Sequence, residues 1–184
     1  EFTFPGAASV YFVLFKLFGP SFWILDAVIV LIGMSGAFVC LWASKKMLGN
    51  TVYAYAAAAI YVFVGFRWFG IDGEHRMMSP IFAALAVLPL IGGISFKRVA
   101  AAGAFCAAAT FFTQQRGIAA LFAIGLFLLF EVAVRQRDIS RFLLLAVAAV
   151  GSFIVVLLTL LLPFLISAGP ATFYESTIGF LSHY

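Results

Sequence analysis

The chain has 184 residues, of which 65% are hydrophobic and only 10% are charged, with a net charge of +4. Soluble domains carry about 25% charged residues, so this composition, with a mean hydropathy of +1.17, excludes a soluble enzyme, a nucleic-acid-binding protein and a disulfide-stapled secreted domain. The basic residues fall in short clusters between apolar runs, as membrane topology signals do. The composition predicts an integral membrane protein in contact with lipids.

The first predicted element is a short helix over residues 5–18, with the sequence PGAASVYFVLFKLF. At about 1.5 Å per residue this run is too short to cross a hydrocarbon core of about 30 Å. Pro5 suits the first turn of a helix, and the Gly19-Pro20 pair ends it. We therefore expect a juxtamembrane helix that lies at the membrane interface.

Apolar runs with few charges follow, and a helix of about 20 apolar residues crosses a membrane. The six predicted spans cover residues 21–44, 50–68, 77–95, 99–114, 117–134 and 141–165. Residues 99–134 would form a helix of about 54 Å, too long for one span, and the polar TQQRG segment divides them. The sequence thus predicts an all-α polytopic transmembrane helix bundle, a single membrane domain over 1–184 that ends in an interfacial tail over 166–184.

The basic residues predict the orientation. Seven of the 11 fall in three short loops on one side of the predicted membrane: Lys45, Lys46, Lys97, Arg98, Arg135, Arg137 and Arg141. The other four stand singly on the opposite side. Clustered basic residues mark the cytoplasmic side, so both ends of this multi-pass chain are predicted to be extracytoplasmic.

The candidate site residues collect on the predicted outer face. The cations that could bind a phosphate there are Lys16, Arg67, Arg76 and Arg116. Arginine suits phosphate because its planar fork donates two charge-assisted hydrogen bonds. Arg116 is the sharpest candidate because it stands alone between two apolar segments, where it must snorkel to water, pair with an acid or bind an anion.

Two further groups of polar residues lie on the same predicted face. In the segment RWFGIDGEHRMMSP, the side chains of Asp72, Glu74 and His75 could contact a substrate or hold a divalent metal ion, but a solvated turn explains the same charges. In the tail, His183 and Tyr184 are the residues that could reach a substrate, the alternative being an interfacial segment without a role in binding.

Three stretches of the chain occur in an order that is found in one family of membrane enzymes. FPGAASVYFVLFKLFGPSFW (Phe4–Trp23) matches a juxtamembrane stretch, FFTQQRG (Phe111–Gly117) matches an lTKQxG turn with Arg116 near its basic residue, and FYESTIGFLSHY matches an aromatic tail that closes on a Tyr. The chain resembles the multispanning glycosyltransferases of the C-type (GT-C) fold, in the bacterial branch similar to protein O-mannosyltransferases and lipid A aminoarabinose transferases. The resemblance covers most of the chain, although each motif alone is weakly specific.

The resemblance implies that a sugar is transferred from a polyprenyl-phosphate donor to an acceptor on the extracytoplasmic face of a bacterial inner or plasma membrane. The acceptor is left open among protein, lipid and polysaccharide. The cations named above would bind the donor phosphate, and a divalent cation could assist them. In this family the catalytic acid precedes the juxtamembrane stretch, so we expect the base upstream of Glu1 and expect this fragment to be inactive alone.

Two other classes of protein would also need apolar spans. A segment of a transporter or permease usually has polar residues and broken helices near the bilayer midplane, often in two repeats. The predicted spans are almost uniformly apolar there, and no second copy is visible. A non-catalytic membrane subunit would leave Arg116 and the polar residues 72–76 without a role.

Overall fold

The computed structural model describes residues 5–66, 75–134 and 138–177. Every regular element in these ranges is a helix, which confirms the all-α prediction. In chain order the elements are α1 (Gly6–Phe18), α2 (Phe22–Leu48), α3 (Thr51–Ile60), the π-helix η1 (Tyr61–Phe66), α5 (His75–Ile91), α6 (Phe96–Phe112), α7 (Gln114–Val134), α8 (Ile139–Ala168) and α9 (Pro170–Thr177).

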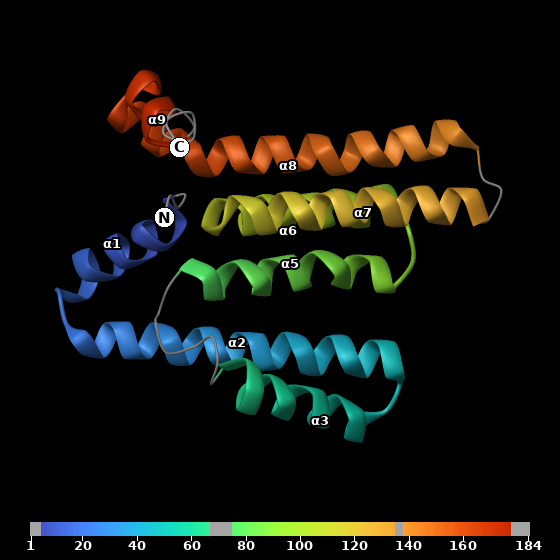
Figure 1. The fold of residues 1–184 in the computed structure, drawn as a ribbon, viewed down its shortest axis with the longest axis horizontal. Helices are drawn as coiled ribbons and strands as arrows, with labels where there is room; N and C mark the ends of the chain where they lie inside the picture. Colours follow the sequence, from blue (N-terminus) through green and yellow to red (C-terminus); the bar gives the residue numbers. More distant parts are fainter. Residues whose placement is uncertain (1–4, 67–74, 135–137, 178–184) are drawn as a thin grey trace.

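The helices lie side by side, and from α2 to α8 each runs opposite to the one before it, so that α2 and α5, with the short α3 between them in the chain, run in the same direction (Figure 1). The α6 helix is central and packs against α5, α7 and α8, while α2 packs against α5 and carries α3 on its outer side. The bundle therefore has two ends. We call one the α1 end, because it holds α1, α9 and the α6–α7 turn at Thr113. The other is the basic end, which carries Lys45, Lys46, Lys97 and Arg98.

Three of the described helices are long and apolar enough to cross a membrane, namely α2 with 27 residues, α7 with 21 and α8 with 30. The α5 and α6 helices have 17 residues each, about 26 Å, and α3 has 10. The structure thus supports three of the six predicted spans and is compatible with an integral membrane protein. The α5 helix is shorter than its predicted span over 77–95 because the chain turns at Gly92 and Gly93, where Gly93 has a φ of +108°.

Polar caps fix the turns at the basic end. The Asn50 side chain accepts the Val52 N–H at 2.8 Å, and Asp138 Oδ1 accepts the Ser140 N–H at 3.2 Å. These bonds satisfy N–H groups that have no acceptor inside a first helical turn. At the end of α2, Gly49 adopts a left-handed conformation with a φ of +65°, which stops the helix.

The α6 helix approaches α8 closely because the contacting residues are small. Gly103 faces the Ala149 carbonyl and the Ser152 hydroxyl so closely that a Cβ at this position would overlap both. Ser152 Oγ also donates a hydrogen bond of 2.7 Å to the Ala100 carbonyl, from α8 to α6. Small residues and hydrogen bonds between helices are typical of membrane helix packing.

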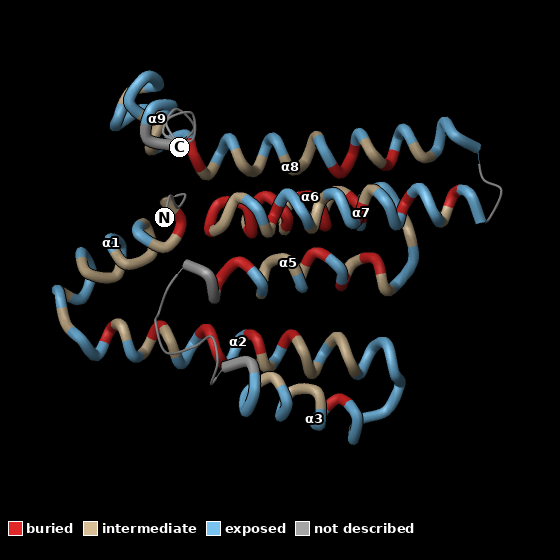
Figure 2. Tube along the Cα trace, viewed as in Figure 1, coloured by how far each residue is buried: buried red, intermediate tan, exposed pale blue. Residues whose placement is uncertain are grey.

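The buried residues face the neighbouring helices and the exposed residues face outward (Figure 2). Much of the outward surface is apolar, as expected for helices in lipid. Trp23 and Trp42 are exposed on α2 and stand 19 residues apart, about 28 Å along the helix. This separation is close to the hydrocarbon thickness of about 30 Å, and tryptophan is enriched at both membrane interfaces.

Candidate functional site

The α6–α7 turn at the α1 end consists of one residue, Thr113. Thr113 is extended (φ −147°, ψ 109°); its N–H donates to the Ala109 carbonyl at 2.9 Å, and its own carbonyl accepts the Gly117 N–H at 3.4 Å. A Cβ at Gly117 would overlap Thr110 and the Cys106 carbonyl. The glycine of TQQRG therefore lets α7 start directly against α6.

The N-terminus of α1 lies against the same turn. Gly6 is buried against the Phe111 carbonyl and the Phe112 ring, where a Cβ would overlap both. Pro5 precedes the helix and provides no side-chain cap. The first N–H groups of a helix have no acceptor inside it and carry a partial positive charge. The positive ends of α1 and α7 therefore lie close together.

Arg116 lies in the first turn of α7 and is half-buried. The predicted spans 99–114 and 117–134 had left it between two helices. Thr113 precedes α7 directly, and its Oγ1 is buried with no hydrogen-bond partner among the described residues. The macrodipole opposes a cation at a helix N-terminus, whereas an anion there gains from the free N–H groups and from a guanidinium. The turn is thus suited to a phosphate.

An open apolar groove of about 910 Å³ lies beside this turn, and we call it the α1 groove. It is formed by α1, α2, α5 and α6, and it includes Phe112, the residue directly before Thr113. Phe82 stacks on Phe112 with ring centroids 5.4 Å apart. Along α2 the lining extends from Val28 to Val39, about 16 Å. A long apolar chain could lie in this groove with its polar end at the α6–α7 turn.

Tyr11 adds a polar group on α1, beside the groove-lining Val10. Burial raises the pKa of the Tyr11 phenol above its ordinary value. Its ring stacks on Phe15 of the same helix with centroids 6.1 Å apart, and both rings pack against a buried cluster that includes Phe111 and Phe112. The phenol therefore stays protonated at neutral pH and can donate a hydrogen bond.

The other predicted site residues are not assembled around Arg116 in the described part of the chain. Lys16 is exposed in the last turn of α1, ten residues from Gly6 and about 15 Å along the helix. Lys16 is therefore far from the N-terminus of α1 that meets the α6–α7 turn. The side chains of the remaining predicted residues lie outside the described part: Arg67, Asp72, Glu74, His75, Arg76, His183 and Tyr184.

Among the described residues there is no group of three His, Cys, Asp or Glu side chains that could hold a metal ion. The metal ligands predicted in the 72–75 segment fall outside the described side chains, so that prediction stays open to experiment.

Gly6, Tyr11 and Thr113 belong to the candidate site but were not predicted from the sequence. Thr113 belongs to the TQQRG motif and directly precedes α7, but its Oγ1 makes no N-cap hydrogen bond among the described residues. Gly6 and Tyr11 lie in the juxtamembrane stretch that carries the resemblance, but the sequence did not indicate that they meet this turn, since only the packing of α1 on α6 brings them there.

Comparison of the chain with protein-family models, with curated protein sequences and with solved structures finds no significant match.

Proposed function

We propose that the chain belongs to a membrane glycosyltransferase that uses a polyprenyl-phosphate sugar donor and acts at the α1 end of the bundle. One observation carries the proposal: the α1 groove includes Phe112, and the next residue, Thr113, leads into the first turn of α7, which carries Arg116. The two parts suit a molecule with a long apolar chain and an anionic head. A polyprenyl phosphate has this chemistry, and the sequence motifs favour it over other amphiphiles.

In the proposed reaction the acceptor oxygen bonds to the sugar carbon while the bond from that carbon to the lipid phosphate breaks. The acceptor proton passes to a carboxylate base, as the sequence resemblance implies. The lipid phosphate leaves as an anion, and Arg116 and the first N–H groups of α7 stabilise it as it departs. The α1 groove holds the polyprenyl chain, which keeps the phosphate at the turn.

The charge distribution supports an outer location for this site. Lys45, Lys46, Lys97 and Arg98 are all exposed at the basic end. If that end is cytoplasmic, as the positive-inside rule favours, the α1 end faces the extracytoplasmic side. Sugar donors on polyprenyl carriers would then meet their acceptors outside the cytoplasm.

The substitution Arg116→Gln tests the proposal. We expect transfer by the full-length protein in liposomes to fall at least about 100-fold, the usual effect of losing one donor to a developing oxyanion. Undecaprenyl phosphate should also raise the thermal unfolding midpoint of the wild-type chain, and raise that of the variant much less. Arg141→Gln, at the basic end, is the matched control and should change neither measurement. Transfer at the wild-type rate by Arg116→Gln would refute the assignment.

A transporter segment makes a different prediction. Purified protein in liposomes would then move a solute across the membrane without consuming a lipid-linked sugar. Sugar transfer to an acceptor without solute movement is the result that we expect.

A further inference from the structure

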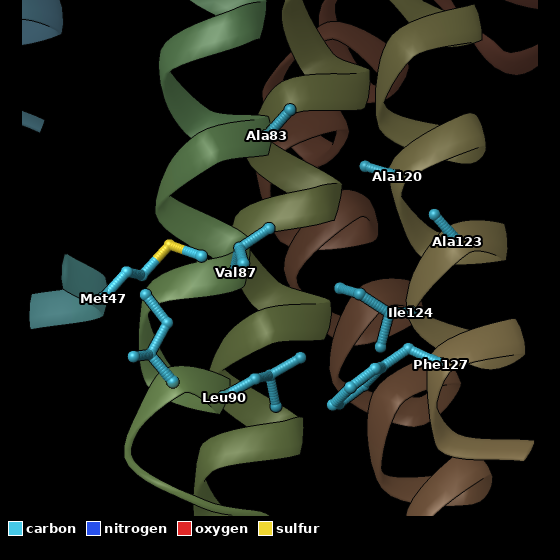
Figure 3. A pocket seen from close by; sticks show the side chains of 9 residues that line it. Met47, Ala83, Val87, Leu90, Ala120, Ala123, Ile124 and Phe127 are labelled. Carbon is cyan, nitrogen blue, oxygen red and sulfur yellow. The ribbon is translucent and has the colours of Figure 1, made fainter. Parts of the chain in front are cut away.

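A second open groove lies between α5 and α7 and shares no lining residue with the α1 groove. We call it the α5–α7 groove; its volume is about 430 Å³, and all its lining residues are apolar. Leu90 and Ile124 are buried at its floor, and the exposed side chains of Met47, Val87 and Phe127 lie around them (Figure 3). The groove is thus open along the side of the bundle that would face lipid.

Arg98 is held at one end of this groove. Ile91 lines the groove, and the next two residues, Gly92 and Gly93, present carbonyl oxygens that both accept from Arg98 Nη1. The side chain of Arg98 is exposed, and no described residue accepts a hydrogen bond from its Nε or Nη2. A guanidinium has five N–H donors in a fixed fork, so the free edge of Arg98 can bind a phosphate.

Lys46 adds a second exposed cation at the basic end, on α2. It directly precedes Met47 in the chain, and its Nζ lies 5.5 Å from the centroid of the Trp42 ring, a cation–π contact.

Two acids lie toward this end among the described residues. Glu131, one turn beyond Phe127 on α7, is half-buried and its Oε2 lies inside the protein. Asp138 is exposed but accepts two hydrogen bonds from Ser140 at the start of α8, a helix that does not line the groove. The exposed charge at this end of the groove is therefore positive.

We propose that the basic end binds an anionic phospholipid, with one acyl chain in the α5–α7 groove and the phosphate at Arg98 and Lys46. These two cations favour an anionic headgroup over a zwitterionic one, because the ammonium group of a zwitterionic lipid would be repelled by them. Basic residues near a membrane surface attract anionic lipids in this way. The site is independent of the sugar donor and would exist whatever reaction the protein catalyses.

The length of the groove favours an acyl chain over a partner helix. Its lining on α5 extends from Ala83 to Ile91, about 12 Å along the helix. One leaflet contributes about half of a hydrocarbon core of about 30 Å, so the groove covers most of one leaflet. A membrane-spanning helix of a partner would need a groove through the whole core.

The test is lipid retention. The 184-residue chain is reconstituted in vesicles of equimolar phosphatidylglycerol and phosphatidylcholine, extracted in mild detergent and examined by native mass spectrometry. We expect phosphatidylglycerol to be retained at least about five-fold over phosphatidylcholine, and expect the double variant Lys46→Gln/Arg98→Gln to lose this preference. Ala123→Phe, which fills the groove, should lower the retention of both lipids.

Arg141→Gln is the matched control, because Arg141 is an exposed cation in the first turn of α8, which does not line the groove. It should keep the wild-type preference. Equal retention of the two lipids by the wild-type chain would overturn the proposal. An equal loss of the phosphatidylglycerol preference in Arg141→Gln and Lys46→Gln would also overturn it, because any surface cation would then have the same effect. Because Arg98 also holds the α5–α6 turn, circular dichroism checks the fold of the double variant, and Lys46→Gln alone should lower the preference with that turn intact.

Discussion

At the start of α8, the carboxylate of Asp138 makes the stability of the fold depend on pH. Asp138 Oδ2 accepts the Ser140 hydroxyl at 2.5 Å, and Oδ1 accepts the Ser140 N–H at 3.2 Å. These bonds, the hydroxyl first, lower the pKa of Asp138 below its ordinary value. A lowered pKa in the folded state means that the charged form stabilises the fold. This stabilisation is complete above the unfolded pKa of about 3.9 and is lost as the pH falls through the lowered folded value.

The variant Asp138→Asn should reveal this dependence, because asparagine can still cap the helix but does not titrate. We expect the wild-type chain to have the higher thermal unfolding midpoint at pH 7, and the difference to shrink as the pH falls below about 4. Circular dichroism in detergent from pH 7 to pH 3 measures it. Asp26→Asn, which removes an exposed carboxylate inside α2, serves as the control. A difference that stays constant over this range would contradict the prediction.

At the scale of the elements, the structure makes opposite predictions for the same substitution at two helical glycines. A Cβ at Gly103 would overlap the Ala149 carbonyl and the Ser152 hydroxyl, whereas nothing lies within 4 Å of the corresponding position at Gly125 in α7. Gly103→Ala should therefore force α6 from α8 and destabilise the fold by about 1–3 kcal/mol, the usual cost of overpacking. Gly125→Ala should be neutral or stabilise by up to about 1 kcal/mol, because alanine is the better helix former.

Thermal unfolding of both variants in the same detergent measures these effects. A loss of stability in both variants would indicate that glycine itself is needed at each position. A neutral Gly103→Ala would show that α6 and α8 can separate at no cost, contrary to the close packing of the two helices.

Polar residues made some of the helix boundaries predictable. The TQQRG segment predicted a break between two helices, and α6 and α7 do separate there, at Thr113. The break lies earlier than the gap between the predicted spans, because Gly117 fits against Thr110 and lets α7 begin before Arg116. Likewise, the turn at Gly92 and Gly93 ends α5 before the predicted boundary at 95. Runs without charges show where a helix can continue, but turns within those runs depend on local backbone geometry.

The candidate site was only partly predictable. The motif identified Arg116 as a cation between two apolar segments, and the structure places it at a helix N-terminus. The α1 groove could not be inferred, because Val10, Val28, Phe82 and Phe112 come from four different helices and meet only through their packing. In apolar helices every face resembles the others in sequence, so grooves leave almost no pattern.

At the scale of the whole molecule, the two ends of the bundle differ in chemistry, and this difference predicts its orientation. The basic end exposes Lys45, Lys46, Lys97 and Arg98, while the α1 end holds the proposed phosphate-binding turn. Clustered basic residues remain on the cytoplasmic side during membrane insertion. A phosphate site that serves an extracytoplasmic reaction therefore has to be at the opposite end. A measurement of the orientation is thus also a test of the proposed function.

Cysteine labelling in intact cells tests this orientation. In a background without Cys40 and Cys106, the single substitutions Gln115→Cys and Asn50→Cys place a thiol at exposed positions of the α1 end and the basic end, respectively. A membrane-impermeant maleimide reacts with a thiolate that water can reach, so we expect Gln115→Cys to be labelled from outside. Asn50→Cys should react only after the membrane is permeabilised. The reverse pattern would place the α1 end in the cytoplasm, and a transfer reaction on the outer face would then be impossible at Arg116.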